Sequence, residues 1–183
     1  MRFVLFLVLI SSCQTSLLKI PPNSRSPDYL DSLKKYSNVN KKYVEFENQI
    51  FAKATIYSDD FREHLTKELR NLYGDKMPDG ALELVRTKRC NVFLSITTPI
   101  YEEANINHKD NAIEVTAIQD GKTHNYDTID KLIEESAVFR EFFPYINNWG
   151  MNYLLEFKDL NCNSPMEIQV ASPKTKLEIP LNF

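Results

Sequence analysis

The dipeptide Asp120-Gly121 is the feature that most constrains the fold of this chain, because it separates two stretches of strand-forming residues. An Asp-Gly pair readily adopts the positive φ angles of the two-residue turns that join adjacent antiparallel strands. It therefore predicts a hairpin in which residues 112–119 pair with residues 122–126. Strands joined so tightly cannot be parallel neighbours, which need a long crossover.

Other segments show the patterns of helices and further strands. Ser58-Asp59-Asp60 predicts a helix start, and Gly74 predicts its end after Tyr73; Thr128 predicts the start of a second helix that ends at Pro144. Both helices carry an apolar stripe, which indicates packing on a sheet. Five further stretches have the aromatic and β-branched composition of strands: 43–57, 91–100, 151–160, 166–171 and 177–181.

The order of these elements predicts the fold class. Strands follow one another through turns, and the two helices are inserted separately instead of alternating with strands. This order argues against a doubly wound parallel sheet. We expect an α+β fold, with an antiparallel β-sheet or sandwich of six to seven strands and two amphipathic helices packed on it.

The N-terminus has the pattern of an export signal. Arg2 precedes an unbroken apolar run at residues 3–10. The run is about eight residues long, whereas a membrane-spanning helix needs roughly 20, so we expect a removable signal peptide at residues 1–12. The sequence Ile10-Ser11-Ser12-Cys13 resembles the lipobox of bacterial lipoproteins. This resemblance implies cleavage before Cys13 and attachment of lipid to that cysteine.

The signal also sets the expected division of the chain. We expect the lipidated cysteine and a proline-broken tether at residues 13–42, and then a single globular domain at 43–183. Within the tether, Ser26 and Pro27 predict the start of a short helix. Ordinary secretory cleavage after Cys13 is the alternative, and it would yield a secreted soluble protein.

A loose set of mostly aromatic positions continues from Ala54 onward. They are Ser58-Asp59-Asp60-Phe61-Arg62, Tyr73-Gly74, Phe142-Phe143-Pro144-Tyr145, Trp149, Tyr153 and Phe157. Through these positions the domain resembles a group of uncharacterised bacterial lipoproteins. The resemblance implies lipoprotein status, and no activity comes with it.

The number of cysteines indicates a covalent bridge. If Cys13 carries lipid, Cys90 and Cys162 remain as an even pair in an oxidising compartment. We expect a disulfide between them, which would stabilise the fold by about 4 kcal/mol by closing a loop of about 72 residues. The alternative is two separate buried thiols.

Charge and motifs exclude several classes of function. The chain carries 22 Lys and Arg against 25 Asp and Glu residues, a net charge of −3. Without a basic run, this balance gives no electrostatic basis for binding nucleic acid. The sequence contains no glycine-rich phosphate loop, Gly-x-Ser-x-Gly, His-Glu-x-x-His or EF-hand pattern. We expect no cofactor.

The best candidate for a metal site lies on the first predicted helix, where Asp60, His64 and Glu68 are one turn apart. Such a face is more often solvated, so we expect no metal. His108 and His124 are isolated in the sequence. A calcium site between loops could in principle gather Asp59, Asp60, Asp110 and Asp127, but Asp59 and Asp127 are more simply explained as helix-start residues.

Aromatic residues gather toward the C-terminal third: Phe139, Phe142, Phe143, Tyr145, Trp149 and Tyr153. Their spacing favours a buried corner between a helix and a strand. The functional alternative is an exposed patch of Tyr145, Trp149 and Tyr153 that binds a partner or a carbohydrate ring. Burial of Trp149 distinguishes the two interpretations.

These patterns together predict a lipid-anchored protein of the cell envelope. In the bacterial lipoproteins that this start resembles, an aspartate after the cysteine retains many proteins in the inner membrane. Gln14 stands at this position instead, so the resemblance favours the outer membrane. We expect a non-catalytic binding or structural module, with an envelope protein or peptidoglycan as partner. The alternative is a lipid-anchored periplasmic hydrolase, in which two of His64, His108 and His124, or one of them with a carboxylate, meet in a pocket.

Overall fold

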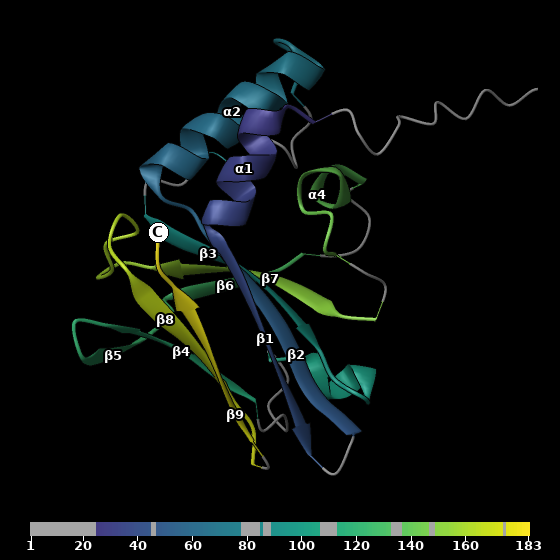
Figure 1. Ribbon diagram of the computed structural model, residues 1–183, viewed down its shortest axis with the longest axis vertical. Coiled ribbons are helices and arrows are strands. Elements are labelled where there is room, and N and C mark those ends of the chain that lie inside the picture. The colour runs from purple at the N-terminus through teal and green to yellow at the C-terminus, as the bar shows by residue number, and fades with distance from the viewer. Residues whose placement is uncertain are drawn as a thin grey trace, which may run out of the picture.

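The computed structural model describes residues 25–44, 47–77, 85, 89–106, 113–132, 137–146, 149–173 and 175–183 (Figure 1). Over these residues the chain forms an α+β fold with nine strands in two antiparallel sheets. The predicted fold class is confirmed, with nine strands instead of six to seven. The predicted signal peptide and Cys13 lie outside the described residues.

Five strands form the larger sheet, in the order β1-β2-β3-β7-β6. They are β1 Ser37–Val44, β2 Glu47–Ile56, β3 Cys90–Thr97, β7 Met151–Phe157 and β6 Thr128–Lys131. The smaller sheet has four strands in the order β5-β4-β8-β9. They are β5 Lys122–Asn125, β4 Glu114–Gln119, β8 Met166–Ala171 and β9 Lys176–Leu181. All neighbouring strands are antiparallel.

Two helices, α1 and α2, lie side by side across one end of the sheets, and the short helix α4 lies beside the larger sheet (Figure 1). Their bounds are α1 Pro27–Lys35, α2 Asp59–Tyr73 and α4 Ala137–Phe142, with a 3-10 turn, η1, at Tyr101–Ala104. The predicted caps explain the first two helices. The hydroxyl oxygens of Ser26 and Ser58 accept backbone N–H groups in the first turns, and Gly74 ends α2 at a φ of 59°. None of the helices in the described part of the chain is long and apolar enough to cross a membrane.

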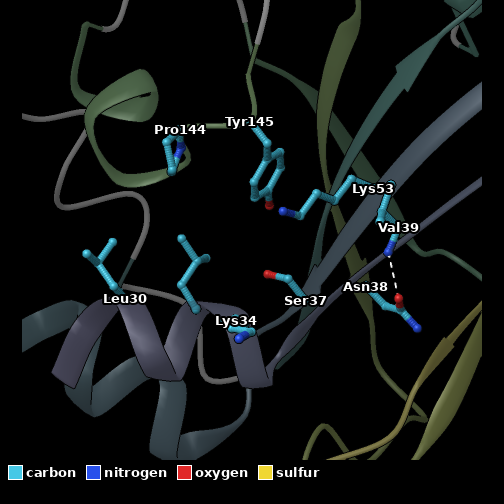
Figure 2. A pocket seen from close by; sticks show the side chains of 9 residues that line it. Leu30, Lys34, Ser37, Asn38, Val39, Lys53, Pro144 and Tyr145 are labelled. Carbon is cyan, nitrogen blue, oxygen red and sulfur yellow. Dashed lines mark hydrogen bonds between the residues drawn. The ribbon is translucent and has the colours of Figure 1, made fainter. Parts of the chain in front are cut away.

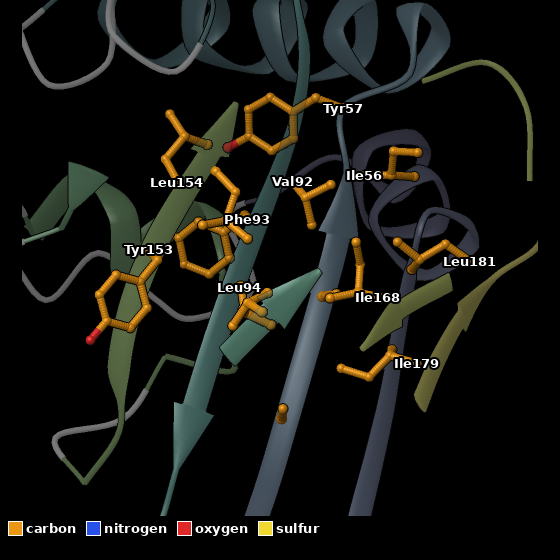
Figure 3. Packing of buried hydrophobic residues seen from close by; sticks show 14 of the residues in the cluster. Ile56, Tyr57, Val92, Phe93, Leu94, Tyr153, Leu154, Ile168, Ile179 and Leu181 are labelled. Carbon is orange, nitrogen blue, oxygen red and sulfur yellow. The ribbon is translucent and has the colours of Figure 1, made fainter. Parts of the chain in front are cut away.

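One part of the hydrophobic core lies between the two sheets. Ile56, Val92 and Leu94 of the larger sheet are fully buried, and they face Ile168 and Ile179 of the smaller sheet (Figure 3). Strand side chains alternate between two faces, so each strand buries every second residue in this layer. Each fully buried aliphatic side chain contributes roughly 1.5–3 kcal/mol. This layer supports the elements that surround the candidate site.

The hairpin predicted at Asp120-Gly121 is confirmed. β4 pairs with β5, and Gln119 stands opposite Lys122 at the turn. Asp120 and Gly121 have φ angles of 53° and 73°. Both values fall in the left-handed region, where Gly has no steric penalty and Asp has a small one.

The predicted helix from Thr128 is wrong over its first part. Thr128–Lys131 forms strand β6, which pairs with the edge of β7 so that Ile129 stands opposite Leu155. Only the last part of the prediction, α4, is a helix, and it ends before Pro144 as expected. Pairing with a strand more than twenty residues away satisfies the backbone groups of β6, and this outweighs a local helix start.

The fold extends further toward the N-terminus than expected. The predicted short helix is α1, and its residues Tyr29 and Leu33 are buried in the core. β1 follows directly and pairs with β2 along its length. Residues 25–42, expected as part of a tether, therefore belong to the folded domain, because the apolar side of α1 and the edge of β2 both gain a partner.

Cys90 and Cys162 lie at disulfide distance, with sulfur atoms 2.16 Å apart and Cα atoms 5.0 Å apart. The Cα separation is within the range that a disulfide needs. Cys90 is the first residue of β3 in the larger sheet, and Cys162 lies in the loop that leads to β8 in the smaller sheet. The pair therefore connects the two sheets at one end.

Candidate functional site

An open groove of about 480 Å³ lies on the outer face of the larger sheet, the face that points away from the smaller sheet (Figure 2). Residues of α1, β1, β2 and the segment after α4 line it. We call it the α1 groove. Its lining residues are Leu30, Leu33, Lys34, Ser37, Asn38, Val39, Lys53, Pro144 and Tyr145.

A buried carboxylate positions α1, the first wall of the groove. Glu68 of α2 is only 3% exposed, and its oxygens accept the backbone N–H of Ser26 at 3.0 Å and the Ser26 hydroxyl at 2.6 Å. The carboxylate thus faces the N-terminus of α1, where the helix dipole favours negative charge. This contact holds α1 against α2, with Leu30 and Lys34 on the groove side.

A second set of polar contacts joins α1 to α4. The Arg25 guanidinium donates to the backbone carbonyl and the carboxylate of Glu141, both at 3.1 Å, and lies 4.7 Å from the Phe142 ring centroid. The Tyr29 hydroxyl donates to the Phe142 carbonyl at 2.7 Å, and the Tyr73 hydroxyl donates to Glu141 at 2.9 Å. Burial raises the pKa of Tyr29 well above its ordinary value. Three helices are therefore locked together around the start of the domain.

The floor of the groove follows from the register of β1 and β2. Ser37 stands opposite Thr55, and Val39 stands opposite Lys53. Because side chains alternate along a strand, these four residues share one face. The opposite face of β2, which includes Ala54, points into the core between the sheets. The sheet thus separates the polar residues of the floor from the part of the core that lies between the two sheets.

Tyr145 forms the second wall, and an aromatic stack holds it in place. The Phe143 ring stacks on Phe93 with centroids 4.2 Å apart, and Tyr145 meets Phe93 edge-on at 5.7 Å. The Tyr145 hydroxyl lies 2.5 Å from Thr55 Oγ1, which lies 2.6 Å from Ser37 Oγ. Three hydroxyl groups therefore form a continuous hydrogen-bonded chain at the base of the groove.

Two lysines give the groove its charge. The Lys53 ammonium lies 4.1 Å from the centroid of the Tyr145 ring, a cation–π contact (Figure 2). Burial lowers the pKa of Lys53 from its ordinary value. Burial also raises the pKa of Tyr145, while its hydrogen bonds to Thr55 and Ser37 oppose that rise. Lys34 adds a second, exposed ammonium in the last turn of α1.

This arrangement suits non-covalent binding. Leu30 and Val39 are large apolar side chains that remain 41% and 46% exposed in the groove. Ammonium groups beside them supply polar contacts of fixed sign. Among the described residues that line the groove, none carries a carboxylate or an imidazole that would act as a general base beside Ser37 or Lys53.

The aromatic cluster is mostly core, with one exception. Phe142, Phe143 and Tyr153 are fully buried, whereas Trp149 is 77% exposed. The Tyr153 hydroxyl donates to the Ala104 carbonyl at 2.8 Å and accepts the Ile106 N–H, and burial raises its pKa to about 12. Tyr145, Trp149 and Tyr153 therefore do not form one exposed patch; only Tyr145 lines the groove.

The histidines named from the sequence lie apart. The His64 ring nitrogen Nδ1 lies 2.9 Å from the Asp60 carbonyl oxygen, and His124 is on β5 of the other sheet. Glu68 contacts Ser26 instead of joining His64 in a ligand set. His108 lies outside the described residues. In the described part of the chain, no group of three or more His, Cys, Asp or Glu side chains could hold a metal ion.

The loop carboxylates have other partners. Asp59 lies in the first turn of α2, as expected, and accepts the side-chain amide of Asn163 at 2.7 Å. Asp127 precedes strand β6, not a helix; it accepts the backbone N–H of Lys158 at 2.6 Å, and this bond lowers its pKa. Asp110 lies outside the described residues.

The α1 groove was not predicted from the sequence. Its lining comes from segments more than ninety residues apart, and Leu30 and Val39 fell within the expected tether. The signal that was present is the Ser26 cap followed by Leu30, Leu33 and Tyr36 at helical spacing. It indicated an apolar helix face but not what that face would contact.

No protein-family model, curated protein or solved structure matches the chain.

Proposed function

We propose that the chain is a lipid-anchored protein of the bacterial cell envelope whose domain binds a ligand without catalysing a reaction, and that the α1 groove is the binding site. The anchor would be lipid on Cys13, in the outer membrane. An envelope protein or peptidoglycan would supply the ligand group.

The α1 groove is the observation that supports this proposal. Ligand sites are typically concave and largely apolar, with a few polar groups that fix orientation, and their volumes run from roughly 300 to 1,000 Å³. The α1 groove has this character: Leu30 and Val39 are apolar and exposed, and Lys34 and Lys53 supply the polar contacts.

The contacts of Arg25 and Ser26 support the anchored arrangement. They lie directly before α1, and a tether from Cys13 would reach the domain there. Arg25 is bound to Glu141 and Ser26 to Glu68. A tether from Cys13 that ends there would keep the adjacent groove within the length of the tether from the membrane.

Detergent phase partitioning tests the anchor. The wild-type protein should enter the detergent phase, and Cys13→Ala should remain in the aqueous phase, because two or three acyl chains bind a membrane far more strongly than the protein surface does. Wild-type protein in the aqueous phase would end the lipoprotein proposal, and it would favour secretion as a soluble protein.

Site-directed photo-crosslinking in cells tests the binding site. A photoreactive residue at Val39 in the groove should capture an envelope protein or peptidoglycan reproducibly. The matched control is Ile100, which is also exposed and lies outside the groove lining. Equal capture at both positions, or hydrolysis of an envelope substrate that His64→Ala abolishes, would overturn the proposal.

A further inference from the structure

The charge of the α1 groove differs from that of the chain. Its described lining contains two lysines and no carboxylate, whereas the whole chain carries a net charge of −3. The lining is thus a local positive surface on an acidic protein. Such a surface attracts anions and discriminates against cations.

Lys53 is the residue best placed to bind an anion. Its ammonium has three N–H donors, and the contact that the structure gives it is with the face of the Tyr145 ring. A ring face attracts a cation but accepts no conventional hydrogen bond. The lowered pKa of Lys53 indicates that lost hydration is the dominant influence on its charge. An anionic oxygen in the groove would compensate for that loss.

The helix beside the groove limits how much negative charge a bound ligand can carry. The part of α1 that lines the groove, from Leu30 to Lys34, is its C-terminal half. The C-terminus of a helix carries a partial negative charge. This charge opposes the lysines and disfavours a dianion such as a phosphate monoester. Arginine, which binds phosphate through its planar fork, is absent from the described lining.

The rest of the groove favours an apolar chain on the same ligand. Leu30 and Val39 lie on two sides of it, from α1 and β1, and Pro144 lies on a third (Figure 2). Covering an exposed aliphatic side chain is favourable by roughly 25 cal/mol per Å² of apolar surface. A small hydrophilic anion would leave this surface in water.

We propose that the α1 groove binds a monocarboxylate with an aliphatic chain, its carboxylate on the Lys53 ammonium and its chain between Leu30 and Val39. This inference rests on the proposed binding function and names the chemical class of the group that the envelope partner would present. Lys34, at the rim, contributes a second and more solvated contact to the carboxylate.

Titration with octanoate tests the inference. The sample is the full chain with Cys13→Ala, so that no acyl chain of an anchor competes, and binding is followed by calorimetry and by backbone amide shifts. Octanoate should move the amide signals of Val39, Lys53 and Tyr145. Octanol has the same chain without charge, and acetate has the charge without the chain; both should bind at least about tenfold more weakly, a difference of about 1.4 kcal/mol.

Substitutions then assign the contacts. Lys53→Met should weaken octanoate binding by about tenfold or more, which corresponds to the loss of about 1.4 kcal/mol. Lys41→Met is the matched control, because Lys41 shares the outer face of the sheet but lies outside the groove lining; it should have no effect. Lys34→Met should weaken binding by a few-fold, and it remains informative if Lys53→Met fails to fold.

Several outcomes would overturn the inference. They are octanol or acetate binding as tightly as octanoate, equal effects of Lys53→Met and Lys41→Met, and no octanoate binding at all. An absence of octanoate binding would leave crosslinking at Val39 as the separate test of the proposed function. The two proposals therefore fail through different measurements.

Discussion

Helix α1 and the loop of residues 158–165 are both peripheral segments, and different chemistry ties each to the rest of the fold. Partly buried hydrogen bonds hold α1 against α2 and α4, through Ser26 to Glu68 and through Arg25 to Glu141. The loop is held by the Cys90–Cys162 pair and by Gln119, whose side-chain amide exchanges two hydrogen bonds of 2.9 Å with the backbone of Asn161.

The difference has a functional consequence. α1 forms a wall of the groove, and its polar contacts to Glu68 and Glu141 are non-covalent. The loop lies away from the groove, and its tie is covalent. Conditions that break the disulfide should therefore lower stability and leave the groove formed, whereas removal of the Glu68 contact should disturb the groove itself.

The largest effect should come from removing the covalent tie. Replacing both cysteines, Cys90→Ala with Cys162→Ala, should lower the free energy of unfolding by about 4 kcal/mol, because the open chain gains conformational entropy. Urea unfolding measures the loss, and octanoate binding to the folded fraction should be unchanged. Two unreacted thiols in non-reduced wild-type protein would contradict this prediction.

Removing the buried carboxylate should lower the free energy of unfolding less than removing the disulfide does. It should weaken octanoate binding more. Glu68→Ala leaves the N–H and the hydroxyl of Ser26 without their acceptor, and hydrogen bonds to charged groups contribute about 1.5–3 kcal/mol each. We expect a loss of about 3 kcal/mol and faster amide exchange in α1. Glu63→Ala, on the exposed side of the same helix, should stay within about 0.5 kcal/mol of wild type. Equal losses from both variants would mean that Glu68 does not hold α1.

Tyr29→Phe should weaken the α1 contacts by about 1 kcal/mol at neutral pH, since it removes one buried hydrogen bond, that to the Phe142 carbonyl. It also tests a pH dependence. Burial raises the pKa of Tyr29 in the folded protein, so above about pH 10 the unfolded chain loses this proton while the folded chain keeps it. The stabilising effect is therefore complete below that pH and falls as the pH rises.

Urea unfolding between neutral pH and pH 11 measures this slope. One such group contributes about 1.4 kcal/mol per pH unit at most. Tyr57 and Tyr145, also buried with raised pKa values, remain in both proteins. The stability of Tyr29→Phe should thus fall less steeply above pH 10 than that of the wild type. Parallel curves would show that the Tyr29 hydroxyl is not held in a buried bond.

The smallest effect should come from a residue that belongs neither to the α1 hydrogen bonds nor to the disulfide-linked loop. Trp149 is 77% exposed, so Trp149→Ala should change the free energy of unfolding by less than about 0.5 kcal/mol. It is the single tryptophan of the chain, and its fluorescence should be readily quenched by acrylamide. Poor quenching, or a decrease in the free energy of unfolding of more than about 1 kcal/mol, would show that this side chain makes a contact important for folding.

Local patterns predicted the parts of the fold that local chemistry controls. The Ser26 and Ser58 caps, the Gly74 end of α2 and the Asp120-Gly121 turn each depend on atoms within a few residues of one another. The short turns between successive strands predicted the antiparallel class for the same reason. Cys90 and Cys162 were paired by number and compartment, and the fold brings their Cα atoms to 5.0 Å.

The parts that failed depend on distant partners. The local sequence at Thr128 predicted a helix start. In the fold this segment instead pairs with the edge of β7, where Ile129 stands opposite Leu155. The sequence predicted that Glu68 lies on a solvated helix face. In the fold, α1 covers Glu68 and Ser26 donates to it. The two tyrosines of the alternative interpretation, an exposed patch, lie apart, because Tyr145 is on the outer face of the larger sheet and Tyr153 is buried.

By itself the sequence determined the α+β antiparallel class, the starts of α1 and α2, and the central hairpin, because caps and turns are satisfied by neighbouring backbone groups. Only the tertiary structure decided that α1 and β1 belong to the domain, and that Lys53 and Tyr145 meet across the α1 groove. The physical reason is that a groove is made by covering part of a sheet face. Which part is covered depends on how side chains from residues 25–39, 53 and 139–145 pack together, and no short stretch of the chain contains that information.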